Sequence, residues 1–197
     1  MVIGRSFAWG HLPKAGGDAT AAMFQIFGDL VEHQDPPDSD EKHTLFRDRP
    51  AQIEGKRLIL NFRRLPEWVL SRAHHVNKRG LAPEYKPQPM QSPHELAESQ
   101  FPDFRLGTFT DEGKLQIDRW LRVEALAGDF LAFISELRDV SDTERARVLE
   151  LGVVNEGNYD RDLEHWFTPE QIEQMYRRNP GWAAVEERLY GSLVSLR

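Results

Sequence analysis

The chain of 197 residues contains no cysteine. Disulfide bonds, thiolate metal sites and a cysteine nucleophile are therefore excluded. The sequence also lacks any apolar run close to the roughly 20 residues that span a bilayer. Residues 1–5 have neither the basic start nor the long apolar region of a secretory signal. We therefore expect a cytoplasmic protein without a membrane span.

Positive charge is also scarce, because 25 basic residues face 32 acidic ones and the net charge is −7. This balance argues against general nucleic-acid binding, although it is compatible with a local basic pocket. The histidines are scattered, and the acidic stretch 38–41 lacks the glycine and distal glutamate of a calcium loop. We therefore expect no metal. The length predicts one domain, residues 1–197.

Residues 7–27 carry the first functional signal. The short apolar run 7–10 predicts a buried strand, the paired Gly16 and Gly17 predict a turn, and helical spacing of apolar residues begins at Ala19. Glycines let backbone N–H groups approach a ligand closely, and a helix N-terminus favours anions. With the charge of Lys14, this layout is that of a phosphate cradle, although an ordinary joint between strand and helix has the same outline.

A second strand, turn and helix follow at 57–76. Residues 57–63 predict a core strand, and a helix is expected from Pro66 to Val76. Residues 61–80 contain a single acid, Glu67, and five basic residues: Arg63, Arg64, Arg72, Lys78 and Arg79. Arginine at a strand end can bind a phosphate through two hydrogen bonds, and Ser71 can add a hydroxyl. The alternative is a solvated basic face of a helix.

Further strands are expected at 43–46 and 120–124. Further helices are expected at 19–31, 94–99, 127–137, 141–151, 168–178 and 182–189, two of them opened by capping boxes at Ser141 and Thr168. Loops are expected at 32–43, 81–107 and 155–165. Strands separated by helices predict an α/β fold, a three-layer sandwich whose small central parallel sheet is flanked by helices. Ligands of such sheets bind at the carboxyl ends of the strands.

Together the two segments resemble the sulfotransferase superfamily, whose fold is similar to that of P-loop NTPases. His11 to Gly17 (HLPKAGG) looks like the family's 5′-phosphosulfate loop, usually Pro-Lys-x-Gly-Gly-Thr. Phe62 to Ser71 (FRRLPEWVLS) looks like its 3′-phosphate motif, usually Arg-x-Pro followed by a helix with a serine. Residues 121–126 (LRVEAL) are similar to a later strand and turn with Glu-x-Leu.

The resemblance implies a donor, 3′-phosphoadenosine-5′-phosphosulfate (PAPS), and a product, 3′-phosphoadenosine-5′-phosphate (PAP). Lys14 and the helix amides would stabilise charge that develops as the sulfuryl group moves. The implied donor loop comprises Lys14, Ala15, Gly16, Gly17, Asp18, Ala19 and Thr20. Arg63 or Arg64, with Ser71, would hold the 3′-phosphate. Arg64 has the family's spacing to Pro66, whereas Arg63 has its usual spacing to Ser71, so both are candidates.

Asp18 departs from the family pattern, which has threonine at this position. A carboxylate facing the phosphosulfate would repel it, so we expect Asp18 to turn away, leaving Thr20 or backbone amides to contact the donor.

The resemblance also implies a general base before the second motif. Its local candidates are Glu32, His33, Asp35, Glu41 and His43. A histidine titrates near neutral pH, and we favour His33 over His43. His11 is expected to bond to the backbone.

The leading hypothesis is a sulfotransferase that moves a sulfuryl group by in-line displacement onto a hydroxyl of a small molecule, lipid or glycan. Residues 81–107 would form a lid that selects the acceptor. An ATP-dependent phosphotransferase is a weaker alternative, because Lys14 precedes the glycines and Gly-x-x-x-x-Gly-Lys-[Ser/Thr] is absent. A third alternative is a catalytically silent binding module of the same fold.

Overall fold

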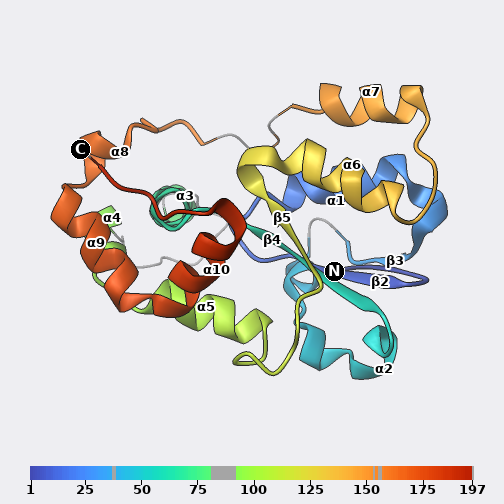
Figure 1. Ribbon diagram of the computed structural model, residues 1–197, viewed down its shortest axis with the longest axis horizontal. Helices are drawn as coiled ribbons and strands as arrows, with labels where there is room; N and C mark the ends of the chain where they lie inside the picture. Colours follow the sequence, from blue (N-terminus) through green and yellow to red (C-terminus); the bar gives the residue numbers. More distant parts are fainter. Residues whose placement is uncertain (37–38, 81–91, 153, 155–156, 197) are drawn as a thin grey trace. The chain divides into compact units, whose positions relative to one another are not determined.

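A computed structural model describes residues 1–36, 39–80, 92–152, 154 and 157–196 (Figure 1). The chain divides into two compact units. The first unit comprises Met1–Phe62 and Thr108–Glu156, and the second comprises Arg63–Gly107 and Gly157–Arg197. Each unit has its own core. The single domain expected from the length stays a prediction.

The first unit contains a five-stranded sheet with the order β3-β1-β2-β4-β5. The strands are β1 (Val2–Gly4), β2 (Phe7–Gly10), β3 (Val31–Gln34), β4 (Arg57–Phe62) and β5 (Arg119–Arg122). Strands β2, β4 and β5 run parallel, with Gly10 beside Leu60 and Phe62 beside Arg122. Strand β1 is antiparallel to both β2 and β3. The carboxyl ends of three parallel strands therefore meet at one edge of the sheet.

The α/β fold class, with a sheet flanked by helices, is confirmed, and the parallel strands are those expected at 7–10, 57–63 and 120–124. The sheet is mixed, however: the expected parallel pairing holds for β2, β4 and β5, whereas β1 is antiparallel to its neighbours. Only residues 5–6 connect β1 to β2, and a parallel connection needs a crossover of a dozen or more residues. Strand β3, where a helix end and a loop were expected, pairs with β1 at the edge of the sheet.

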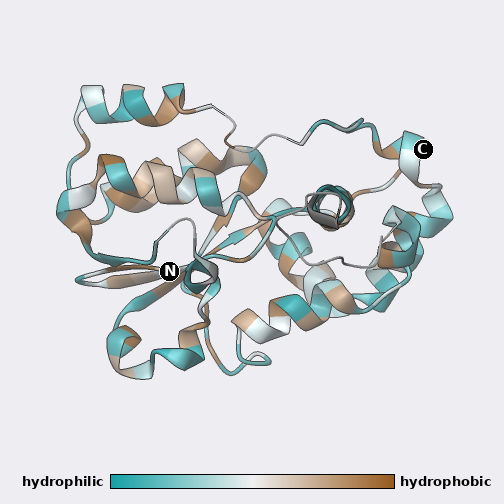
Figure 2. Ribbon diagram, turned by 180° about the vertical axis from the view of Figure 1, so that it is seen from behind, coloured by the Kyte–Doolittle hydropathy of each residue, from teal (hydrophilic) through white to brown (hydrophobic). Residues whose placement is uncertain are grey.

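One face of this sheet packs against the helices α1 (Gly17–Ile26) and α6 (Leu126–Ser135), and α7 (Asp142–Glu150) packs against these two helices (Figure 1). Phe7 of β2 stacks on Phe24 at 5.4 Å and meets the edge of Phe133 at 5.3 Å. Helix α6 carries apolar residues along most of its length (Figure 2). Burial of these aromatic rings fixes the direction in which α1 leaves the turn after β2.

The opposite face of the sheet is covered around Gly10 by Phe46. A Cβ atom at Gly10 would lie 2.8 Å from Leu60 and 2.9 Å from Phe46, so glycine leaves room for that ring. Phe46 opens a 3₁₀ helix, one of four in the described residues, which span Gly28–Leu30, Asp40–His43, Phe46–Asp48 and Val123–Ala125. The short helix α2 (Pro50–Ile53) follows on this side of the sheet (Figure 1).

The strand expected at 43–46 is therefore wrong, because this segment forms turns. The Thr44 hydroxyl donates to the Glu41 carbonyl at 2.6 Å, and the Asp48 carboxylate accepts from the Leu45 N–H at 3.3 Å. Such short-range bonds from side chain to backbone compete with strand pairing.

The second unit is helical in the part that the structure describes, with α3 (Leu65–Gly80), α4 (Pro93–Ala97), most of α5 (Phe101–Phe109), α8 (Leu163–Trp166), α9 (Pro169–Arg178) and α10 (Pro180–Tyr190). Trp68 and Trp182 pack with their rings 5.1 Å apart. The Asp103 carboxylate accepts from the N–H groups of Gly181 and Trp182, which caps α10.

The helices expected at 66–76, 94–99, 168–178 and 182–189 are confirmed as α3, α4, α9 and α10. Of the expected irregular segment 81–107, residues 81–91 lie outside the described part of the chain. The remainder was expected to be largely irregular and instead holds α4 and the start of α5, while α8 ends the loop expected at 155–165. The role of this segment as a lid stays a prediction.

Candidate functional site

The turn between β2 and α1 has two residues in the left-handed region of backbone conformation. Lys14 has a φ of 66° and Gly16 a φ of 74°. Glycine adopts this region readily, whereas a lysine there costs on the order of 1 kcal/mol or more. The Ala15 N–H closes the turn by donating to the Leu12 carbonyl at 3.3 Å. The predicted order of strand, turn and helix is therefore present, with its strain at the one lysine of the motif.

Helix α1 begins directly after this turn. Its N-cap is Gly16, which has no side chain with which to cap the first turn. The N–H groups of the first turn of a helix lack partners within the helix and carry the positive end of its dipole. The turn therefore presents an anion-binding helix terminus at the carboxyl end of β2.

His11 is packed against the start of α1. A Cβ atom at Gly17 would lie 1.9 Å from the His11 Nε2, so any residue except glycine at 17 would displace this ring. Burial, together with the neighbouring His43, lowers the pKa of His11 to about 3. The imidazole is therefore neutral at physiological pH, and it contributes shape rather than charge.

A buried asparagine, Asn61 of β4, ties the turn to the sheet. Its Nδ2 donates to the Ala15 carbonyl and to the Thr20 hydroxyl, both at 2.7 Å, and its Oδ1 accepts from the Trp9 indole at 2.8 Å. The Thr20 hydroxyl in turn donates to the Gly16 carbonyl at 3.2 Å. Ala19 and Thr20, two of the residues predicted to bind PAPS, are buried beneath the turn.

Sequence reasoning did not single out Asn61. The available signal was an amide in the middle of the apolar run 58–62, where an unpaired polar group would be costly.

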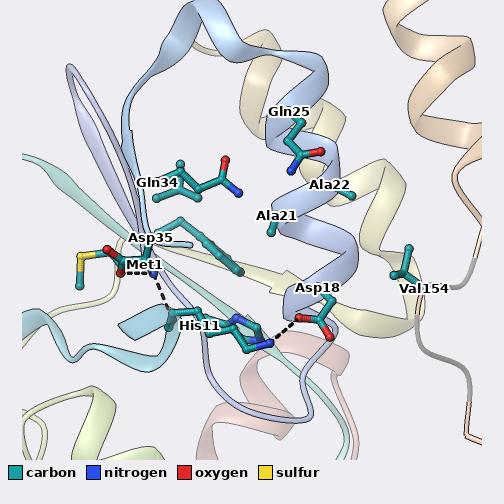
Figure 3. A pocket seen from close by; sticks show the side chains of 12 residues that line it. Met1, His11, Asp18, Ala21, Ala22, Gln25, Gln34, Asp35 and Val154 are labelled. Carbon is teal, nitrogen blue, oxygen red and sulfur yellow. Dashed lines mark hydrogen bonds and ion pairs between the residues drawn. The ribbon is translucent and has the colours of Figure 1, made fainter. Parts of the chain in front are cut away.

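Asp18, in the first turn of α1, forms an ion pair with Lys42. The Lys42 Nζ lies 3.3 Å from the Asp18 Oδ1 (Figure 3). The expected capping role for Asp18 is not seen, since Gly16 is the N-cap and no side chain caps it. The carboxylate lies instead against a lysine 24 positions away in the sequence, which the sequence alone did not indicate.

His43 lies beside the turn. Its Nδ1 is 3.2 Å from the His11 carbonyl oxygen, and the two imidazole rings meet edge to face at 4.5 Å. A carbonyl can only accept, so Nδ1 carries the proton and the lone pair of the neutral ring lies on Nε2.

His33 lies on the edge strand β3 in a different network. Its Nε2 is 2.8 Å from the Asp35 carboxylate and 2.9 Å from Arg49, which also pairs with Asp35 at 2.8 Å. Burial alone would raise the pKa of Asp35, but hydrogen bonds from the Met1 amino group and His33 hold it below its usual value.

The other candidate base on this strand, Glu32, is exposed and lies 3.5 Å from Lys56.

The predicted 3′-phosphate residues belong to the second unit. Arg64 pairs with the buried Glu186 at 3.1 Å and lies 4.1 Å above the ring of Tyr190. Arg63 follows the last residue of β4, and its carbonyl accepts from the Trp182 indole at 3.0 Å. Ser71 is buried on α3.

A cavity of about 280 Å³ opens beside α1 (Figure 3). It is lined by residues from β1, β2, α1, β3 and the 3₁₀ helix that contains Lys42: Met1, Val2, Trp9, His11, Asp18, Ala21, Ala22, Gln25, Gln34, Asp35 and Lys42, together with Val154. His11 and Asp18 belong both to this lining and to the ends of the turn. The cavity is therefore contiguous with the phosphate-cradle turn.

No helix among the described residues is long and apolar enough to cross a membrane. Within the same residues, no group of three or more histidine, aspartate or glutamate side chains is arranged to hold a metal ion.

No protein-family model matches the sequence. No curated protein matches it either. Among solved structures, the fold is similar to that of the mouse sulfotransferase SULT7A1 complexed with PAP, with a TM-score of 0.57 and 12% sequence identity. The match covers 94% of this chain and 90% of the mouse chain. This likeness shows that the chain has the fold of a sulfotransferase, as its sequence motifs predict.

Proposed function

We propose that the chain is a sulfotransferase that transfers a sulfuryl group from PAPS to the hydroxyl of an acceptor. The observation that carries this proposal is the strained Lys14 in a turn that leads into a helix whose N-cap has no side chain. Strain of this kind is maintained mainly at functional sites. The fold is that of a protein whose crystal structure contains PAP, which supports the choice of nucleotide.

In this proposal the turn binds the 5′-phosphosulfate. Backbone N–H groups of Gly16, Gly17 and Asp18 surround the anion, and Lys14 adds a full positive charge. As the bond between sulfur and the bridging oxygen breaks, negative charge grows on the departing 5′-phosphate. Fixed donors that already point at this charge lower the barrier without having to reorganise.

The 3′-phosphate is assigned to Arg63 with Ser71. The guanidinium of Arg64 pairs with Glu186 and stacks on Tyr190. Moving it to a nucleotide would leave a buried carboxylate without its cation, which is costly. The spacing of eight residues between Arg63 and Ser71 supports the same choice.

The general base is assigned to His43 in preference to His33. Its Nδ1–H bond to the His11 carbonyl orients the ring, and Nε2 is the nitrogen that would take the proton of the acceptor hydroxyl. The acceptor oxygen then forms a bond to sulfur, the bond to the 5′-phosphate breaks, and PAP leaves with the electron pair. The Nε2 of His33 lies between Asp35 and Arg49.

Donor binding can be tested by thermal shift with PAP, with adenosine 5′-phosphate and with ATP plus magnesium. A ligand raises the melting temperature according to its affinity and concentration, so PAP should give the largest shift. No shift with PAP, or a larger one with ATP, would contradict the proposal.

Lys14→Ala should reduce sulfuryl transfer from PAPS by roughly 100-fold or more, the usual cost of losing one preorganised charge donor. The fold should be retained, because the lysine side chain is not part of the buried core. Lys114→Ala is the matched control, since this lysine is 72% exposed. Equal turnover in both variants would remove Lys14 from the mechanism.

A second candidate function is a binding module that retains the nucleotide but does not react. The observation that favours it is Asp18, which places a carboxylate in the first turn of α1. Such a module would shift its melting temperature with PAP yet release no sulfate from PAPS and modify no acceptor. Labelled PAPS with a mixture of hydroxyl compounds separates the two functions, because any sulfated product excludes the silent module.

A further inference from the structure

We propose that the cavity beside α1 binds the acceptor, and that the acceptor is a small, uncharged compound with several hydroxyl groups, such as a monosaccharide. This inference rests on the sulfotransferase function proposed above. It concerns the chemistry that the cavity walls select, which the motifs of the donor site do not determine.

The cavity is shaped by one face of α1. Asp18, Ala21, Ala22 and Gln25 recur at helical spacing, and all four line the cavity (Figure 3). The two alanines leave space that longer side chains would fill. At about 280 Å³ the cavity is at the small end of ligand pockets, so it suits a single sugar ring rather than a steroid or an oligosaccharide.

Charges in the cavity wall are balanced. Asp18 pairs with Lys42 at 3.3 Å, and Asp35 pairs with the Met1 amino group and with Arg49, each at 2.8 Å. A charged ligand would have to break one of these pairs or meet a like charge. The wall therefore favours an uncharged ligand over an anionic or cationic one.

Two glutamine amides provide the polar recognition. Gln25 comes from α1 and Gln34 from β3, and both side chains extend toward the cavity (Figure 3). In the part of the chain that the structure describes, no protein group forms a hydrogen bond with either amide. An amide offers both a donor and an acceptor, and so does each hydroxyl of a sugar. A purely apolar phenol or sterol would leave these amides desolvated without partners.

The position of the cavity fits transfer to such a hydroxyl. His11 lines the cavity and is in ring contact with His43, so a hydroxyl bound against His11 lies near the proposed base. In the transfer, the sugar oxygen gives its proton to the His43 Nε2 and forms the new bond to sulfur. The bond between sulfur and the 5′-phosphate breaks, and PAP carries away its electrons.

The test measures acceptor binding separately from transfer. Glucose and N-acetylglucosamine are compared with glucuronate, 4-nitrophenol and cholesterol, first by saturation-transfer NMR without donor and then by sulfation with labelled PAPS. The neutral sugars should bind and be sulfated best. Preferential binding and sulfation of 4-nitrophenol, cholesterol or glucuronate would overturn the inference, as would sugar binding that survives blocking of the cavity.

Three variants locate the site. Gln25→Leu and Gln34→Leu should each raise the sugar KM roughly two- to tenfold, the range for one lost neutral hydrogen bond, with PAP affinity unchanged. Ala22→Phe should fill the cavity and abolish sugar binding. Gln52→Leu, an exposed glutamine of the same unit outside the lining, is the matched control. Equal effects of the control and the lining variants would contradict the assignment.

The same experiments distinguish failure of the two proposals. If the neutral sugars bind in the cavity and PAP gives no thermal shift, the sulfotransferase function fails and the cavity assignment stands. If PAP binds and sugars neither bind nor react, the cavity inference fails and the donor site stands.

Discussion

At the scale of single residues, the pairing of Asp18 with Lys42 is how this chain accommodates a carboxylate in the first turn of α1. The ion pair has partly exposed side chains, with 36% and 23% of their surfaces accessible. It is therefore worth little for stability. Its effect is on anion binding. An unpaired carboxylate next to the helix N-terminus repels a phosphosulfate, and the positive charge of Lys42 offsets that repulsion.

Lys42→Ala should therefore weaken PAP binding by about fivefold, which corresponds to ~1 kcal/mol. The double variant Asp18→Asn with Lys42→Ala should recover wild-type affinity, because the repulsive charge is then absent. Isothermal titration calorimetry with PAP at low salt measures all three proteins. Equally weak binding in the single and double variants would show that Lys42 acts independently of Asp18.

His11 should make stability depend on pH below neutrality. Burial lowers the pKa of this imidazole to about 3, from 6.5 in the unfolded chain. The unfolded state therefore takes up a proton before the folded state does, and stability falls as the pH drops below 6.5, by up to about 1.4 kcal/mol per pH unit.

His11→Gln should flatten this dependence while lowering stability at pH 7.5, where the neutral histidine packs best. Urea midpoints between pH 7.5 and 4.5 provide the measurement. A pH slope that is unchanged in the variant would mean that other groups cause the loss of stability, and the salt-bridged Asp35 would then be examined next, since its lowered pKa acts in the same direction.

At the scale of elements, the sequence was most informative where the determinants are local. The capping boxes at Ser141 and Thr168 correctly marked the starts of α7 and α9, because donor and acceptor lie three residues apart. Strand β3 was not predictable in this way, since its four residues are held by pairing with β1 and not by their own preference. For β3, pairing with a neighbouring strand decided the conformation, and the intrinsic preference of its residues did not.

The capping box of α7 gives a direct prediction. Ser141→Ala removes the hydroxyl that accepts from the Glu144 N–H at 3.3 Å and should cost about 1 kcal/mol of unfolding free energy. Ser135→Ala is the control, because that hydroxyl only donates to the Leu131 carbonyl within α6. Chemical denaturation of both variants measures the difference, and equal stabilities would contradict the capping role.

The candidate site was predictable in part for the same reason. Lys14, Gly16 and Gly17 are contiguous, so their turn could be read directly from the sequence. The partners that hold the turn, Asn61 and His11, act through tertiary contacts that no local pattern reveals. Residue type likewise favoured a histidine as the base but could not rank His33 against His43, whereas the bond from the His43 imidazole to the His11 carbonyl is a tertiary contact.

At the scale of the whole molecule, two compact units share one chain that passes between them after residues 62, 107 and 156. In the second unit, Glu186 is a buried hub. It accepts from the Leu65 N–H and the Tyr176 hydroxyl, both at 2.8 Å, and pairs with Arg64. Burial raises the pKa of this carboxyl in spite of these three donors.

Glu186→Ala should lower the free energy of unfolding by roughly 3–5 kcal/mol, because it removes the acceptor of two buried donors, the Leu65 N–H and the Tyr176 hydroxyl, and the ion pair with Arg64. Glu187→Ala, at the exposed neighbouring position, should change it by less than about 0.5 kcal/mol. Calorimetric melting of both variants measures the effect. A loss that is equally small in both would mean that water replaces the carboxylate at no cost.

The fold as a whole was predictable from the alternation of strands and helices, although no family model matches the sequence. This chain and the mouse sulfotransferase have similar folds at 12% sequence identity. An α/β sheet needs apolar residues in its strands and a phosphate loop needs glycine, whereas most other positions can vary. The antiparallel β1 and β3 were not predictable, since both are short and one lies at the edge.

Trp9 connects several of these features, because its indole donates to Asn61 beneath the turn while its ring lines the cavity. The chain has five tryptophans, and Trp9 is 1% exposed. Its emission should therefore be blue-shifted and sensitive to the electric field of an anion in the turn or of a molecule beside α1. The protein thus carries an intrinsic optical reporter between the two places where donor and acceptor are proposed to bind, and occupancy of either could be followed without a label.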